Sequence, residues 1–118
     1  MPSLVVSIVH GKDSELSSIG VVVANAALVS GQEVYLWLSS DGVNWAIQGY
    51  ASGVHAAGFS PMDELLKAFA QNGGKMIVCP PCFRTRQLDE QKLFPNAELA
   101  GGARLAEILG KGAACISY

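Results

Sequence analysis

Apolar residues in this chain gather in short continuous runs, and each early run is followed by a longer segment with helical signals. Three runs rich in β-branched and aromatic residues predict buried strands, at residues 3–9, 33–38 and 75–79. Two further extended segments are predicted near the end of the chain, at residues 97–99 and 113–118. Because the runs are continuous rather than alternating, we expect a sheet that is covered on both faces.

Helix start and stop signals lie between these strands. Asp13 or Ser14 can cap a helix that runs to about Ser30 and stops at Gly31. Pro61 is predicted to open a second helix, which ends at the Asn72-Gly73-Gly74 sequence. Further helices are predicted over residues 80–88 and 102–110, with a short one at 45–48. An irregular Gly-rich connection and a second irregular stretch are expected over 49–60 and 89–100.

This alternation of strands and helices predicts an α/β fold. Parallel strands joined by helical crossovers give a sheet with helices on both faces. We therefore expect a single three-layer α/β/α domain over residues 1–118, with a mostly parallel five-stranded sheet.

Composition adds an expectation about assembly. Apolar residues make up 50% of the chain and charged residues only 15%, with a mean hydropathy of +0.30. A membrane helix needs about 18 or more apolar residues in a row, whereas the stretch 19–29 is shorter and includes Asn25. No membrane span is predicted, and the first long helix is apolar nearly all round. A high apolar content without a membrane span, and a helix without a polar face, both favour a homo-oligomer.

The net charge and the cysteine content limit the classes of partner and the cellular compartment that we expect. A net charge of −2 argues against nucleic acid as the main partner, since phosphate binding needs a basic face. The first residues, MPSLVVSIVHG, lack the positive region of a secretory leader and instead predict a strand. Three cysteines, an odd number, do not suggest a disulfide framework. We expect a cytoplasmic protein with reactive or buried thiols.

The segment KMIVCPPCFRTRQL carries the strongest chemical signal. Cys79 ends a predicted strand and Cys82 follows in the next turn, at the edge of a parallel sheet where ligands usually bind. A helix start together with Arg84 and Arg86 is expected to lower the pKa of these thiols. The residue types and their placement suit a reactive cysteine.

Four interpretations of the two cysteines compete. A thioredoxin-like motif needs more structure downstream than the 36 residues that follow Cys82 provide. A zinc site needs about four ligands, and the other candidates, His10, His55 and Cys115, are scattered. Cys79 can also be a buried strand residue ended by two prolines, or it can be a sulfur-handling thiol. We predict neither a metal nor a cofactor.

Other polar and aromatic residues give weaker signals. His10 follows the first strand on the same edge, where it can line the site and shuttle protons or simply be solvated. Asp41 is expected in a turn, and Cys115 is expected to be a buried structural thiol. Four residues can cover the cysteines, fill a subunit contact or merely pack: Trp45, Tyr50, His55 and Phe59.

Several segments in order resemble the DsrE-type family of small sulfur-relay proteins. They are "LWLSSDGV", "GFSPMDELLKAFAQNGGKMIVCPPC" and "AELAGGARLAEILGKGAACISY". On this resemblance Cys79 matches the family's sulfur-accepting cysteine, and Arg86 matches an arginine that follows it. Cys82 stands where relay members usually carry a small residue, and Gln87 replaces a glycine.

The resemblance implies a DsrE-like fold, a trimer or hexamer of identical subunits, and donor and acceptor proteins for sulfur. Cys79 would carry sulfane sulfur as a persulfide, in the manner of a sulfurtransferase-like carrier. Cys82 could attack that persulfide, release sulfide and leave a disulfide, so thiol redox sensing is an alternative. A further alternative is a non-catalytic binding or interaction module, with an anionic ligand on Arg84 or Arg86.

Overall fold

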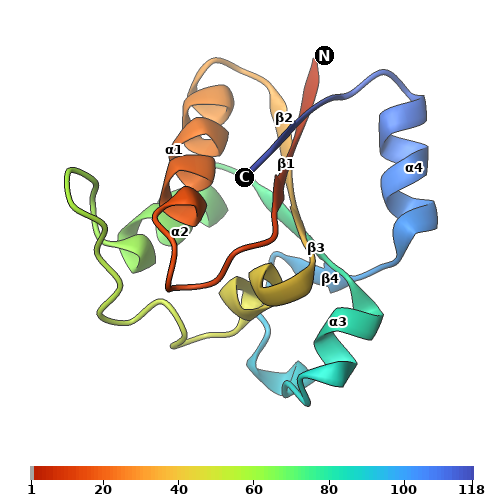
Figure 1. Ribbon diagram of the computed structural model, residues 1–118. Helices are drawn as coiled ribbons and strands as arrows, with labels where there is room; N and C mark the ends of the chain where they lie inside the picture. The colour runs from red at the N-terminus through yellow and green to blue at the C-terminus, as the bar shows by residue number, and fades with distance from the viewer. Residues whose placement is uncertain (1) are drawn as a thin grey trace.

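A computed structural model describes residues 2–118, which form one five-stranded sheet flanked by helices (Figure 1). Its strands are β1 (Ser3–Ile8), β2 (Glu33–Leu38), β3 (Lys75–Val78), β4 (Ala97–Leu99) and β5 (Ala114–Ser117). They lie in the order β4-β3-β2-β1-β5, and every neighbouring pair is parallel. The predicted parallel α/β fold is confirmed.

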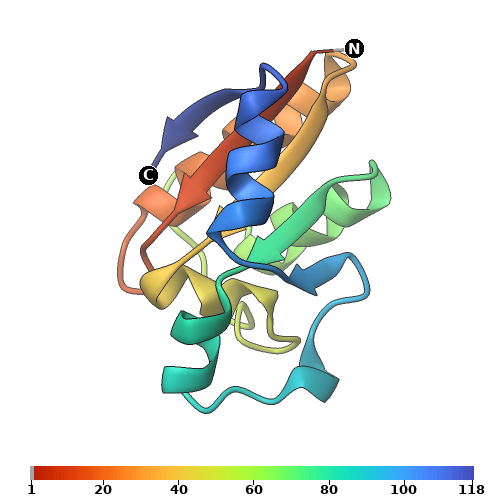
Figure 2. The ribbon, with the colours of Figure 1, turned by 90° about the vertical axis from the view of Figure 1, so that its right-hand side faces the viewer.

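Helices cover the two faces of the sheet. α1 (Leu16–Val29) and α2 (Met62–Gln71) pack on one face, and α4 (Gly102–Gly110) packs on the other (Figures 1 and 2). The short helix α3 (Pro80–Thr85) follows β3 directly. Two 3₁₀ helices complete the described chain, η1 (Ser40–Ala46) and η2 (Glu90–Lys92). The sheet is therefore the middle layer of three.

The core follows from the two-residue repeat of the strands. Val6 and Leu36 point to the face under α1 and α2, whereas Val5, Tyr35 and Ile77 point to the face under α4. Because both faces are covered, consecutive residues of the central strands are buried. This explains why these strands appear in the sequence as continuous apolar runs.

The local signals at the helix ends act as the sequence predicts, with shifts of one or two residues. Gly31 and Gly73 adopt left-handed backbone, with φ of +93° and +89°, just after α1 and α2. The hydroxyl of Ser14 accepts a hydrogen bond from the Leu16 N–H at 3.2 Å. Pro61 lies immediately before α2 rather than at its first residue.

Two expectations are wrong. The short helix predicted at 45–48 lies earlier, as η1, because the chain turns at once after β2 through Ser40, whose φ is +52°. Cys115 is exposed, as are all four residues of β5. β5 is an edge strand that pairs with β1 alone, so an apolar strand pattern did not bring burial in this chain.

Part of α1 is also uncovered. Leu16 and Val29 are 40% and 81% exposed, so the expected covering of this helix on all sides is not seen within one chain. Among the described residues, no helix is both long and apolar enough to cross a bilayer.

Candidate functional site

Cys79 lies where β3 passes into α3, and both neighbouring elements hold its backbone. Its N–H donates to the carbonyl of Leu38, the last residue of β2, at 3.0 Å. Its own carbonyl accepts a hydrogen bond from the N–H of Phe83 at 3.0 Å. The site is thus built on the carboxyl edge of the sheet, as the parallel topology predicts.

Cys82 follows in the first turn of α3, which is fixed from both ends. Pro80 and Pro81 occupy the first two helical positions, where their preset φ suits the helix and the missing N–H groups cost nothing. Phe83, almost fully buried, anchors the helix in the core. Both cysteines are half-buried against the main core cluster, and each shifts the pKa of the other.

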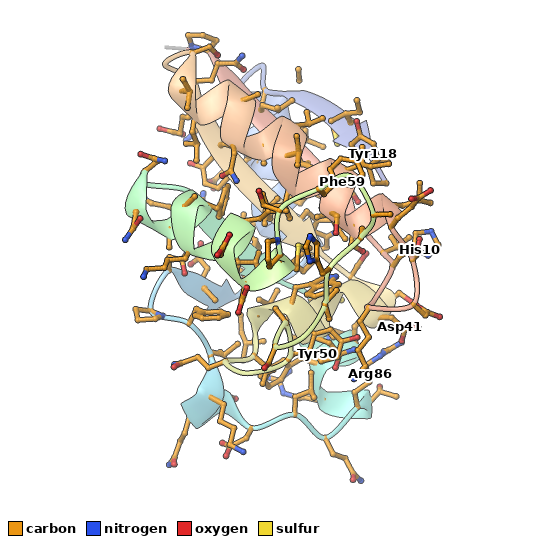
Figure 3. All side chains as sticks on the ribbon, turned by 90° about the vertical axis from the view of Figure 1, so that its left-hand side faces the viewer. His10, Asp41, Tyr50, Phe59, Arg86 and Tyr118 are labelled. Carbon is orange, nitrogen blue, oxygen red and sulfur yellow. The ribbon has the colours of Figure 1, made fainter. Side chains whose placement is uncertain are left out.

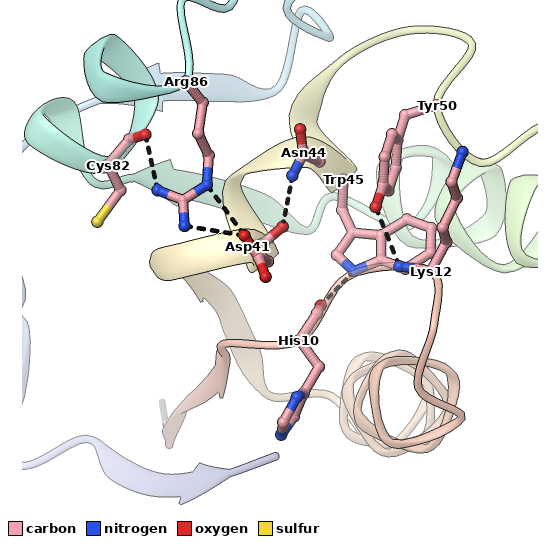
Figure 4. A network of polar contacts seen from close by, with 8 residues as sticks. All are labelled: His10, Lys12, Asp41, Asn44, Trp45, Tyr50, Cys82 and Arg86. Atoms are coloured by element: carbon pink, nitrogen blue, oxygen red, sulfur yellow. Dashed lines mark hydrogen bonds and ion pairs between the residues drawn. The ribbon is translucent and has the colours of Figure 1, made fainter.

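Arg86 links α3 to η1, the segment that follows the neighbouring strand (Figure 4). Its Nε and Nη2 donate to Asp41 Oδ1 at 3.1 and 2.8 Å, and its Nη1 donates to the Cys82 carbonyl at 3.2 Å. All three guanidinium nitrogens are therefore engaged, which holds a positive charge next to the first turn of α3. Figure 3 shows the side chains of Asp41 and Arg86 next to each other at this edge of the molecule.

Ser40 completes the site from the side of η1. Its backbone N–H is one of the groups that lower the pKa of the Cys82 thiol. Its φ of +52° is uncommon for a residue with a side chain, a conformation that costs on the order of 1 kcal/mol. The turn after β2 therefore packs against the helix that follows β3.

The two thiols have different electrostatic surroundings. Burial raises the pKa of the Cys79 thiol, and its hydrogen bond with Cys82 raises it further, although a backbone N–H of Cys82 and the charge of Arg86 act against this. The hydrogen bond from Cys79 lowers the pKa of Cys82, and the Ser40 N–H and Arg86 lower it further, while burial opposes them.

This division corrects one expectation from the sequence. The pKa of Cys82 is lowered as predicted, but that of Cys79 is raised, because burial and the neighbouring Cys82 both raise it. Arg86 is the arginine that acts on both thiols. Arg84 lies exposed in the last turn of α3.

The imidazole of His10 is not brought to the cysteines. Figure 4 shows it pointing away from the Asp41–Arg86 pair, while its carbonyl accepts hydrogen bonds from Trp45 Nε1 at 2.8 Å and Ser17 Oγ at 2.6 Å. His10 thus joins the site region through its backbone, and the role predicted for its side chain stays a prediction.

The aromatic residues of the Gly-rich segment pack the loops together. Trp45 is buried and meets Tyr50 edge-to-face, with ring centroids 4.9 Å apart. The Tyr50 hydroxyl accepts a hydrogen bond from the Lys12 N–H at 3.0 Å. His55 Nε2 lies 2.6 Å from the Phe59 carbonyl in the exposed part of the segment. Trp45 and Tyr50 therefore tie the loop after β1 to η1.

Two further features of residues 2–118 bear on ligand binding. Nowhere in this part of the chain do three His, Cys, Asp or Glu side chains gather as a metal site. A cavity of about 520 Å³ lies at the start of α1, lined by residues 12–15, 18 and 52–57. It does not include the cysteines, so the chemistry and this cavity are separate features.

Comparison with known proteins gives the family. The model of the DsrE/DsrF-like family matches residues 3–118, nearly the whole chain. The chain belongs to the DsrE/DsrF-like family. The resemblance stated from the sequence segments is confirmed, together with the fold that it implied.

Solved structures agree with this DsrE/DsrF-like fold. The YchN protein from E. coli is 17% identical, with a TM-score of 0.82, and the match covers 100% of this chain and 99% of that chain. MTH1491 from Methanobacterium thermoautotrophicum, a protein of unknown function, is 15% identical, with a TM-score of 0.76 and full coverage of both chains. BT1422 from Bacteroides thetaiotaomicron, also of unknown function, is 14% identical, with a TM-score of 0.69, covering 98% of this chain and 94% of that one. A comparison with curated protein sequences finds no match.

Sequence reasoning missed two residues of the candidate site, Ser40 and Asp41. A signal was present, because both follow β2, and β2 pairs with β3 in a register that sets Leu38 opposite Val78. Residues just beyond Leu38 therefore meet residues just beyond Val78. Asp41 was expected only to form a turn, and it both turns the chain and binds Arg86.

Proposed function

We propose that this DsrE/DsrF-like protein handles sulfane sulfur, taking the terminal sulfur of a donor persulfide and holding it as a cysteine persulfide on the Cys79–Cys82 pair. The observation that carries the proposal is the placement of two half-buried thiols, three residues apart, at the carboxyl edge of the sheet. The guanidinium of Arg86 donates to the Cys82 carbonyl and so lies close to the first turn of α3. The resemblance assigns the accepting role to Cys79.

The chemistry requires a thiolate and a stabilised anionic product. A thiolate attacks the terminal sulfur of R–S–SH, the S–S bond breaks, and R–S⁻ leaves as its thiol after taking a proton. The new cysteine persulfide ionises readily, so a nearby positive charge favours it. Arg86 lowers the pKa of both thiols and supplies that charge. An acceptor thiol then removes the sulfur by the same kind of exchange.

The rival function, an anion-binding module, has less support at Arg86. Three of the five N–H donors of its guanidinium are already used by Asp41 and the Cys82 carbonyl, and its charge is paired with the Asp41 carboxylate. An anionic ligand would have to compete with that carboxylate. Thiol chemistry uses Arg86 in the position where it is held, so we favour it.

We also propose that the protein works as a homo-oligomer, a trimer or hexamer, with separate donor and acceptor proteins for sulfur. The support is the apolar surface that one chain leaves open. The residues of β5 are exposed along an edge with free backbone groups, and Val29 is 81% exposed. Sedimentation analysis tests the assembly: a monomer at micromolar concentration would contradict it.

The sulfur proposal is tested by persulfide loading. The background variant is Cys115→Ser, because the exposed Cys115 would otherwise react as well. The protein is mixed with a low-molecular-weight alkyl persulfide, and intact-mass spectrometry detects the gain of one sulfur atom. We expect loading of the background variant and none when Cys79→Ser and Cys82→Ser are added together. Equal loading of the two proteins would overturn the proposal.

A further inference from the structure

We propose that the cavity at the start of α1 binds a free α-amino acid, held through both its ammonium group and its carboxylate. This site is separate from the Cys79–Cys82 pair and does not depend on the sulfur-handling function proposed above. The cavity has a volume of about 520 Å³ and is lined by residues 12–15, 18 and 52–57. That volume lies within the usual range of small-molecule sites, about 300–1,000 Å³.

The cavity lies at a place in the fold where α/β proteins bind ligands. β2, β3 and β4 extend the sheet on one side of β1, whereas β5 returns to the other side. In parallel sheets, ligands bind beyond the carboxyl ends of the strands at such a reversal of strand order. Residues 9–15 leave β1 at this edge and lead to α1, and residues 12–15 form one wall of the cavity.

Ser18 supplies a buried hydroxyl group to the cavity. The residue is only 2% exposed, and it is one of the residues that line the cavity. Its hydroxyl donates to the sulfur of Met62 at 3.9 Å, and a thioether sulfur is a weak acceptor. Most buried polar side chains have a stronger hydrogen-bond partner than this. A ligand carboxylate in the cavity would be such a partner.

The first turn of α1 adds backbone donors beside this hydroxyl. The first N–H groups of a helix have no acceptor within the helix, and they favour an anion. Glu15, at the N-cap position, makes no capping hydrogen bond through its side chain. Within residues 2–118, the N–H groups of Ser17 and Ser18 donate to no backbone or side-chain acceptor. They are therefore available to the same carboxylate.

Charged side chains of both signs surround this position. Lys12, Asp13 and Glu15 line the cavity, are exposed, and form no ion pair within the described part of the chain. The Lys12 ammonium lies over the Tyr50 ring, 5.2 Å from its centroid (Figure 4). A purely anionic ligand would meet the two carboxylates, and a purely cationic one would meet the N-terminus of α1. A zwitterion suits both, which is the reason for proposing an α-amino acid.

The opposite wall, residues 52–57, contributes mainly small and apolar surface together with one imidazole. It includes Val54 and two alanines. His55 Nε2 lies 2.6 Å from the Phe59 carbonyl, and because a carbonyl oxygen only accepts, Nε2 donates and the ring is held in place. This wall would contact the side chain of the amino acid. Since it carries no full charge when the imidazole is neutral, we expect it to favour uncharged side chains.

Nuclear magnetic resonance with ¹⁵N-labelled protein tests the site. Each of the common L-amino acids is added at millimolar concentration, and the backbone amide shifts are followed. We expect at least one uncharged amino acid to shift the signals of residues 12–18 and 52–57 in a saturable way. Its amide, which lacks the carboxylate, and its N-acetyl derivative, which lacks the ammonium, should each bind at least about tenfold more weakly.

Protein variants test the assigned contacts with the amino acid that binds best. Ser18→Ala and the double variant Asp13→Asn, Glu15→Gln should each weaken binding about tenfold or more. Glu90→Gln removes an exposed carboxylate outside the cavity and is the matched control, which should bind as wild type does. The double variant Cys79→Ser, Cys82→Ser should also bind unchanged. Thermal unfolding checks each fold, and the two exposed carboxylates test the site even if Ser18→Ala is unstable.

Several results would overturn the inference. They are the absence of shifts with every amino acid, shifts confined to other parts of the chain, and equal binding of the amino acid and its amide or N-acetyl derivative. Unchanged binding by Asp13→Asn, Glu15→Gln would remove the ammonium site and with it the proposed ligand class. Failure of persulfide loading with intact amino-acid binding would refute the sulfur-handling function alone, so the two proposals fail separately.

Discussion

Gly42 is the residue whose replacement the structure predicts most sharply. It is buried in η1, and a Cβ added there would lie 2.0 Å from the Ile8 carbonyl oxygen and 2.8 Å from its carbon. The obstacle is the backbone at the end of β1, which cannot rotate away as a side chain can. Gly42→Ala must therefore push η1 away from the sheet.

The expected loss of stability follows from this displacement. A carbon and an oxygen normally come no closer than about 3.3 Å, so the two segments must separate by roughly 1 Å. Overpacking of this kind costs about 1–3 kcal/mol. The hydrogen bond from the Ser39 N–H to the Ile8 carbonyl, 3.3 Å long, is also weakened, which adds on the order of 1 kcal/mol. We expect Gly42→Ala to lower the free energy of unfolding by about 2–4 kcal/mol.

Urea unfolding measures this change, and Gly102→Ala is the matched control. A Cβ at Gly102 meets nothing within 4 Å, and this residue opens α4. The control should leave stability unchanged or raise it by up to about 1 kcal/mol. Both variants should keep the wild-type dependence on urea concentration. A Gly42→Ala protein within about 0.5 kcal/mol of wild type would refute the reasoning.

Two further predictions concern the thiols, both in the Cys115→Ser background. Asp41→Asn should cost less than about 1 kcal/mol of stability, because this ion pair is 30% and 62% exposed, but it should slow alkylation of Cys82 by freeing Arg86. Glu107→Gln, which breaks the comparable pair with Arg104, is its control, and equal alkylation rates in the two would contradict the role of Arg86. Cys79→Ala should shift the pH profile of Cys82 alkylation to higher pH, because Cys79 is the main cause of the lowered pKa of Cys82. The charge that faces Cys82 is Arg86, which also lowers this pKa and is bound to Asp41. The stability that this lowered pKa gives is present above the pKa of the unfolded thiol and is lost as pH falls through the folded one; an unmoved profile would be decisive against this effect of Cys79.

The fold was predictable because its signals are local. Continuous apolar runs separated by Gly and Pro punctuation identify the strands, and the bounds of β2, β4 and α4 agree with those expected from the sequence. The placement of Cys79 followed in the same way, since a buried run that ends in two prolines must stop there. Parallel topology then set the cysteines at the carboxyl edge.

What could not be predicted depends on distant neighbours. The exposure of Cys115 is decided by the edge position of β5, and an apolar strand at the edge has the same sequence pattern as one in the middle. The raised pKa of Cys79 depends on the core residues around its sulfur. The position of His10 depends on the groups that donate to its carbonyl, Ser17 and Trp45, which lie 7 and 35 residues further along the chain. None of these properties can be predicted from the residues next to the one concerned.

The contact between η1 and α3 explains why the two cysteines differ although they lie three residues apart. If α3 alone set their electrostatic surroundings, both thiols would lie near the same helix start and nearly the same charge from Arg86. The backbone N–H of Ser40 lowers the pKa of Cys82 and does not act on that of Cys79. The turn that carries Ser40 is held by Gly42, packed on Ile8, and by Asp41, bound to Arg86. Loosening either contact is expected to move Ser40 relative to Cys82. The reactivity of Cys82 therefore depends on a turn about forty residues earlier in the chain, and stability and thiol chemistry should fall together when that turn is disturbed.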